Sequence, residues 1–119
     1  VCAATARTAT TTSDTILNDN AAGMYVIWDM DDVEQGGDVT MHIEMRNPID
    51  GTWNIIYSSA AIGAAADAIY LFYPGDIADP GALYVDEEKI PIPRYFRFRM
   101  AHAAGGGSYT YSLAVCFCT

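Results

Sequence analysis

Apolar and polar residues alternate along much of this chain, which is the pattern of β-strands with one buried and one solvated face. The alternation is clearest over residues 39–46, VTMHIEMR, where every second residue is apolar. It returns over residues 94–100, where Phe96, Phe98 and Met100 are expected to face inward. It also returns over residues 109–117, where one face is expected to hold Tyr109, Tyr111, Leu113, Val115 and Phe117. The pattern predicts six strands in all. These are residues 24–30, 39–46, 52–57, 68–73, 94–100 and 109–117.

The segments between these strands have weaker signals. The turn NPIDG at residues 47–51 predicts a hairpin that joins the strands on either side of it. Two further strands are plausible. Residues 5–12 are rich in threonine, which favours an extended strand, and residues 58–62 could extend the hairpin or begin a short strand. The alanine-rich residues 62–67 are too short for a helix, so we expect a loop there. Residues 74–93 hold four prolines and predict an unusually long connection, which in a compact domain is often functional.

Several short strands separated by Gly/Pro turns predict an all-β fold, an antiparallel β-sandwich or jelly-roll-like single domain. A length of 119 residues fits one hydrophobic core. We expect residues 13–119 to form this domain and residues 1–12 to form an extended N-terminal arm. The arm could add a strand to a neighbouring molecule, or it could pack onto its own sheet.

Charge and hydropathy exclude some partners. Fifteen acidic residues against six basic ones give a net charge of −9, which argues against nucleic-acid binding. No apolar run approaches the roughly 18 residues of a membrane-spanning helix. Residues 1–15 lack the basic start and apolar middle of a signal peptide, so a leader was either removed or never present.

The three cysteines lie close to the two ends of the sequence. Cys116 and Cys118 are expected on one face of a strand, so a disulfide from Cys2 to one of them is more plausible than a bridge between them. The remaining thiol would be free or would pair between subunits. A zinc site that adds His42 or His102 is an alternative, although neither histidine has convincing ligand spacing. The cysteines could also be small hydrophobic residues only.

A run of acidic residues surrounds a Gly-Gly turn after the first clear strand. Alternating carboxylates in a loop are the ligands that calcium prefers, although the spacing is not that of an EF-hand. The alternative is a solvated connection between two strands. The candidate calcium ligands are Asp29, Asp31, Asp32, Glu34 and Asp38.

Most of the few basic residues are close together in sequence. Arg97 and Arg99 should share the outward face of their strand with Tyr95, and Lys89 and Arg94 precede them. Such a stripe is either paired with acids on a neighbouring strand or forms a contact surface for a partner. The candidate partner-contact residues are Arg7 of the arm, Arg94, Tyr95, Arg97 and Arg99.

No recognisable motif for a nucleophile, a phosphate or a cofactor occurs in the chain, so we expect neither an enzyme nor a bound cofactor. Aromatic residues on an exposed sheet face could instead bind sugars, which would make the protein a small carbohydrate-binding module. The candidates for that role are Trp28, Trp53, Tyr70, Tyr73 and Tyr84.

A set of short segments, in this order, resembles small β-sandwich structural proteins of tailed bacteriophages. The segments are ARTAT at 6–10, VTMHIEMRNP at 39–48, GTW at 51–53, YPG at 73–75, PRYFR at 93–97 and SYTYS at 108–112. The terminal cysteines and the acidic loop depart from that likeness.

The resemblance implies a non-enzymatic virion protein that decorates or cements the outer surface of the phage head, made in the host cytoplasm. Its partners would be the major capsid protein and copies of itself, most simply in a closed trimer, with no nucleic acid and no membrane. Strong negative charge would keep such a protein soluble at high copy number. A tail or neck accessory protein is the alternative within the virion.

Overall fold

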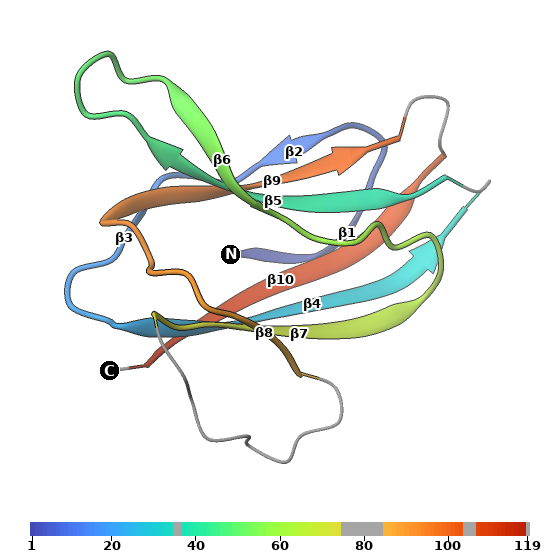
Figure 1. Ribbon diagram of the computed structural model, residues 1–119. Coiled ribbons are helices and arrows are strands. Elements are labelled where there is room, and N and C mark those ends of the chain that lie inside the picture. Colours follow the sequence, from blue (N-terminus) through green and yellow to red (C-terminus); the bar gives the residue numbers. More distant parts are fainter. Residues whose placement is uncertain (35–36, 75–84, 104–106, 119) are drawn as a thin grey trace.

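The computed structural model describes residues 1–34, 37–74, 85–103 and 107–118, and these residues form strands and loops without a helix (Figure 1). The all-β prediction is confirmed. The strands are β1 (Cys2–Arg7), β2 (Thr11–Thr12), β3 (Ile16–Leu17), β4 (Gly23–Val33), β5 (Val39–Arg46), β6 (Trp53–Ser58), β7 (Ala66–Phe72), β8 (Val85–Glu88), β9 (Tyr95–His102) and β10 (Tyr109–Cys118).

The strands form two sheets. The first, called here the β4 sheet, has the order β1-β10-β4-β7-β8, and the second, the β5 sheet, has the order β2-β9-β5-β6, with β3 also paired to β9. All pairs are antiparallel except β7 with β8. The two sheets lie over one another as two layers (Figure 1).

All six strands expected from the alternation are present, within a few residues at their ends. Residues 62–67 were expected to form a loop. Residues 63–65 do so, whereas Ala66 and Asp67 already belong to β7, and Ile62 forms an isolated bridge with Val39. The sequence pattern did not predict β3 or β8. Strand β8 lies within residues 74–93, which were expected to form only a connection, and it pairs in parallel with β7.

The core lies between the two sheets because alternate residues of β4, β7 and β10 point toward alternate residues of β5 and β9. Trp28 of β4 and Phe96 of β9 are completely buried. Tyr109, Tyr111 and Leu113 are buried as expected, whereas Phe117, near the end of β10, is 45% exposed. The buried cluster consists of Met24, Val26, Trp28, Met30, Val39, Met41, Ile43, Tyr70, Phe72, Phe96, Phe98, Met100, Tyr109, Tyr111 and Leu113.

The N-terminal segment packs onto its own sheets, which is one of the two arrangements considered for the arm. Strand β1 pairs with β10, and the amino group of Val1 donates a hydrogen bond to the Leu113 carbonyl over 2.7 Å. The chain then crosses to the β5 sheet, where Thr11 and Thr12 pair with β9. Residues 1–12 therefore connect the edges of both sheets.

Candidate functional site

Strand β9 presents basic and aromatic side chains on the outer side of the β5 sheet. Because Phe96, Phe98 and Met100 fill the core, the intervening Arg97 and Arg99 face outward, as the alternation predicted. Tyr95 at the start of the strand is 44% exposed. This side of the sheet therefore joins three of the predicted contact residues on one surface.

Glu44 of β5 holds both arginines. Its Oε1 accepts a hydrogen bond from Nε of Arg97 over 2.8 Å, and its Oε2 accepts one from Nε of Arg99 over 3.3 Å. The Glu44 residue itself is only 6% exposed. The two guanidinium groups shield its carboxylate from solvent while they remain partly accessible. The cross-strand pairing that the sequence allowed is thus present for both arginines.

Apolar side chains flank this ion cluster on both sides. Ile55 of β6 lies opposite Glu44, and Leu17 of β3 lies opposite Tyr95, so all of them share the outer side of the sheet. Leu17 and Ile55 are each 48% exposed. We call this surface the arginine face, and it comprises Leu17, Glu44, Trp53, Ile55, Tyr95, Arg97 and Arg99.

Two cation–π contacts fix the aromatic rings of the arginine face. The Arg97 guanidinium lies 4.2 Å from the ring centroid of Trp53. The exposed Arg94 lies 5.8 Å from the ring of Tyr95. Planar guanidinium groups stack well on aromatic rings, so these contacts limit the motion of long side chains that would otherwise be flexible.

His42 lies on the same side of β5, next to the cluster. Its Nδ1 is hydrogen-bonded to the Ser58 hydroxyl over 2.7 Å. Partial burial, and then the nearby Arg99 cation, lower the pKa of His42 below its usual value. His42 is therefore a neutral hydrogen-bonding residue near neutral pH.

Arg7 is not part of the arginine face, although it was predicted as a contact residue with the other arginines. It belongs to β1 of the β4 sheet, where its Nη1 donates to the Tyr111 carbonyl over 2.7 Å and its Nη2 to the Ala3 carbonyl over 2.7 Å. Its guanidinium also lies 4.5 Å from the Tyr111 ring centroid. Arg7 fixes β1 onto β10.

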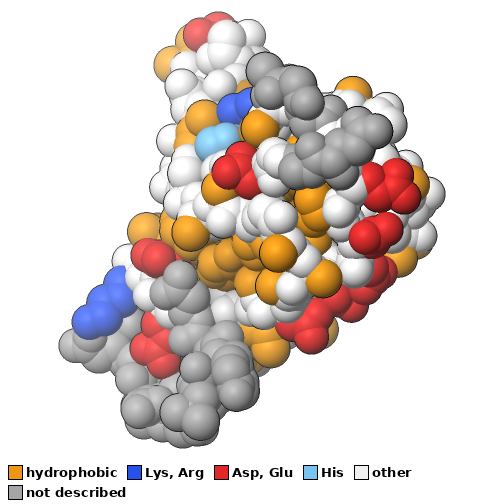
Figure 2. All heavy atoms as spheres, turned by 90° about the vertical axis from the view of Figure 1, so that its right-hand side faces the viewer, with side chains coloured by type: hydrophobic (Ala, Val, Ile, Leu, Met, Phe, Trp, Pro, Cys, Tyr) orange, Lys and Arg blue, Asp and Glu red, His pale blue; other side chains and the backbone are white. Residues whose placement is uncertain are grey.

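The five candidate calcium ligands do not form a metal site in the described part of the chain, where no three acidic, histidine or cysteine side chains lie close enough to hold an ion. Asp29 of β4 lies directly opposite Asp67 of β7 instead. A hydrogen bond between the two carboxyl groups, with local desolvation and the nearby Asp31 charge, raises the pKa of Asp29 to about 6. Figure 2 views the molecule from the end at which β4 finishes, and acidic side chains are gathered along one side of that view.

The predicted disulfide from Cys2 is not present: all three cysteines are free. Cys2 lies opposite Leu113, so Cys116 is three positions farther along β10, or about 10 Å away. That separation exceeds the reach of a disulfide, and Cys118 is farther still. A zinc site with these cysteines is not present in the described residues either, because His42 bonds Ser58 and His102 bonds the Tyr111 hydroxyl over 3.0 Å.

The aromatic residues considered for sugar binding are dispersed. Trp28 and Tyr70 are core residues, so neither can stack on a sugar. Trp53 lies on the arginine face, and Tyr73 is partly exposed after β7. Tyr84 lies outside the described residues.

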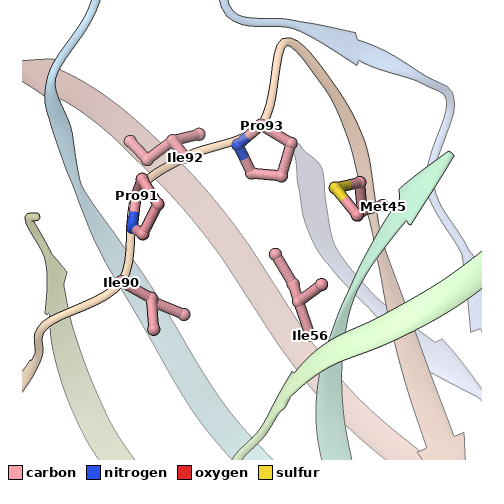
Figure 3. A pocket seen from close by; sticks show the side chains of 6 residues that line it. All are labelled: Met45, Ile56, Ile90, Pro91, Ile92 and Pro93. Carbon is pink, nitrogen blue, oxygen red and sulfur yellow. The ribbon is translucent and has the colours of Figure 1, made fainter.

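A hollow of about 250 Å³ opens at one end of the core, and the sequence did not predict it. Figure 3 shows its apolar lining: Met45 of β5, Ile56 of β6, and the segment Ile90, Pro91, Ile92 and Pro93. The two prolines and two isoleucines alternate within the long connection. That alternation was the only signal in the sequence, and it could not show what lay opposite.

No protein-family model matches the chain, and no curated protein or solved structure matches it either. Within the part of the chain that the structure describes, no helix is long and apolar enough to cross a membrane.

Proposed function

We propose that the two sheets form a β-sandwich with jelly-roll connectivity. If β3 is counted with β2 as one interrupted strand and the parallel edge strand β8 is set aside, eight strands remain. Numbered in chain order, they give the sheet orders 1-8-3-6 and 2-7-4-5. These are the orders that two interlocking Greek keys produce in a jelly roll, an architecture that occurs in viral capsid proteins and in lectins.

We further propose that the chain is a non-enzymatic virion protein of a tailed phage that decorates the outer surface of the head through the arginine face. The observation that carries this proposal is the composition of that surface. It combines exposed Leu17, Ile55 and Tyr95 with two arginines that Glu44 already orients. Tyrosine, tryptophan and arginine are enriched at the centres of protein interfaces.

Glu44 supports the proposal because it prepares the arginines for binding. Each arginine uses its Nε–H toward Glu44, and a guanidinium has five N–H donors in all. Further donors therefore remain for an acidic or carbonyl-rich partner surface. Side chains that are already ordered lose less conformational entropy when a partner binds. Repetition over many equivalent capsid sites would strengthen even weak contacts.

The test adds purified protein to phage heads that lack it and compares Tyr95→Thr with Ile27→Thr. Ile27 is 38% exposed on the outer side of the β4 sheet, so it is a matched control. We expect the wild type and Ile27→Thr to sediment with the heads and to raise their thermal resistance, and Tyr95→Thr to bind less. Heads that do not bind the wild type would contradict the proposal. Heads that bind Tyr95→Thr as tightly as they bind the wild type would contradict it as well. Binding to tails or necks in particle images would favour an accessory role there.

A carbohydrate-binding module is the second candidate, because Trp53 and Tyr95 share the arginine face and lectins include jelly rolls. The Arg97 guanidinium occupies the face of the Trp53 ring, so a sugar would have to displace it. A glycan array with wild type and Trp53→Ala separates the two functions. Binding that Trp53→Ala abolishes would favour the sugar-binding role.

A further inference from the structure

The hairpin between β5 and β6 projects away from both sheets, at the upper left of Figure 1. Ile49 at its tip is 93% exposed, the highest value among the exposed large hydrophobic residues that the structure describes. A single exposed isoleucine is common on protein surfaces. The position of this one, at the end of a projection, makes it accessible to another molecule.

Hydrogen bonds within the turn hold the backbone of the hairpin tip. The Asn47 amide donates to the Thr52 carbonyl over 2.7 Å, and the Gly51 amide donates back to the Asn47 carbonyl over 2.9 Å. The Ile49 amide donates to Oδ1 of Asn47 over 2.9 Å. Asp50 accepts two hydrogen bonds from Thr52, at 2.7 and 3.0 Å. The backbone at Ile49 is thus held in one conformation before any contact forms, which reduces the backbone entropy lost on docking.

The apolar hollow of Figure 3 offers a matching receptor. Its volume of about 250 Å³ is below the range of roughly 300–1,000 Å³ that is typical of small-molecule pockets. It has room for an inserted aliphatic side chain, and its lining of methionine, isoleucine and proline has no polar side chain to select a polar ligand. Apolar anchors inserted into such hollows often dominate binding energy.

Ile49 does not fill the hollow of its own chain. Met45 is the penultimate residue of β5, just before the turn, and Ile56 lies on the strand that follows the turn. The Ile49 side chain is 93% exposed, so it does not enter the hollow that these residues line. The occupant must therefore come from another molecule.

Charge favours a second copy of this chain. Asp50 is the neighbour of Ile49, and its hydrogen bonds from Thr52 lower its pKa and keep it ionised. Exposed Arg94 directly follows Pro93, which lines the hollow, and its guanidinium lies near the Tyr95 ring. Copies of a chain with a net charge of −9 repel one another in general, so an acid beside Ile49 and a base next in sequence to the lining residues favour this contact over other orientations.

We propose that Ile49 of one copy inserts into the hollow formed by Met45, Ile56 and residues 90–93 of a second copy, with Asp50 close to Arg94. The tip and the hollow are different surfaces, so the contact either reciprocates within a pair or repeats from copy to copy, as a ring where the rotation closes and as an open filament where it does not. The inference concerns the free protein and does not depend on binding to a phage head.

The first test measures the mass of the purified protein by sedimentation over a range of concentrations. We expect the wild type to associate, Ile49→Asp to raise the dissociation constant at least about tenfold, and Ile27→Asp to leave it unchanged. Ile27 is also an exposed isoleucine, but it lies on the outer side of the β4 sheet, away from the hairpin tip and from Arg94, so it controls for the added charge. A monomeric wild type, or equal association of wild type and Ile49→Asp, would overturn the proposal.

A second test depends on proximity and not on affinity. In a background with Cys2, Cys116 and Cys118 changed to serine, Ile49→Cys protein is mixed with Pro91→Cys protein under mild oxidation. We expect a disulfide-linked pair of the two different variants in preference to either like pair. No preference for the mixed pair would reject the contact. A small apolar molecule that native mass spectrometry finds on the wild type, and that is lost from the Pro91→Cys variant, would also reject it.

Discussion

Glu44 of β5 and Arg97 of β9 are hydrogen-bonded over 2.8 Å although 53 positions separate them in the chain. Arg99 shares the same carboxylate from its other side. The cluster links the two central strands of the β5 sheet and sets the positions of both arginines on its outer side.

Removal of Glu44 should therefore destabilise the protein. In Glu44→Ala the two guanidinium groups lose their acceptor and repel each other, so we expect the free energy of unfolding to fall by about 1–3 kcal/mol. Glu44→Gln keeps an acceptor oxygen and should lose less. Urea unfolding measures both changes. Glu34→Ala, at an exposed acid, should change stability by no more than about 0.5 kcal/mol, and an equal loss in that control would contradict the assignment.

The Asp29–Asp67 pair should make stability depend on pH. The pKa of Asp29 rises from 3.8 to about 6 on folding, so the folded protein binds more protons than the unfolded chain between these values. The contribution of this raised pKa to the free energy of unfolding is fully present below about pH 4 and is lost as the pH rises through 6. Asp31 adds to the repulsion from β4 itself.

The measurement compares urea unfolding of the wild type with that of the Asp29→Asn variant between about pH 4 and pH 7.5. We expect the variant to gain stability relative to the wild type as the pH rises, with Asp14→Asn as the exposed control. The lowered pKa values of His42 and His102 act in the opposite direction, but they are common to all three proteins and cancel in the difference. If the difference in stability between Asp29→Asn and the wild type does not change with pH, the raised pKa of Asp29 is wrong.

Gly51 should be required for the hairpin tip. Its φ of 75° lies in the left-handed region, where a Cβ is unfavourable. We expect Gly51→Ala to destabilise the protein by about 1 kcal/mol in urea unfolding. Gly51→Asn is the matched variant, since asparagine tolerates this conformation better, and it should lose less. Equal losses in both would show that crowding, and not backbone conformation, sets the requirement.

All three cysteines should react as free thiols. We expect three reactive thiols per chain in denaturant without reductant, with Cys116 reacting fastest in the folded protein because it is exposed. The melting temperature should be the same with and without reductant. Fewer than three reactive thiols, or a faster-migrating band on a non-reducing gel, would indicate a disulfide between the two ends of the chain and contradict this prediction.

Much of the fold follows from local patterns. The alternation in residues 39–46 and 109–117 predicted both strands, and it predicted their buried faces over residues 39–43 and 109–113. Toward the ends of these strands the other sheet no longer covers the inner face, so Met45 and Phe117 are partly exposed. Strand β8 had no such signal, since a short edge strand depends on the neighbour that it pairs with. The same holds for β3, where only two residues pair with β9.

The sequence by itself determined that this is an all-β chain with Arg97 and Arg99 facing away from the core. Only the tertiary structure decided which acid they meet, that Arg7 lies on the other sheet, that Cys2 is out of reach of Cys116, and that Met45 and Ile56 face residues 90–93 across a hollow. The reason is physical: alternation fixes the direction of a side chain from its own strand, whereas its neighbours depend on strand order and register, which bring together residues distant in the chain.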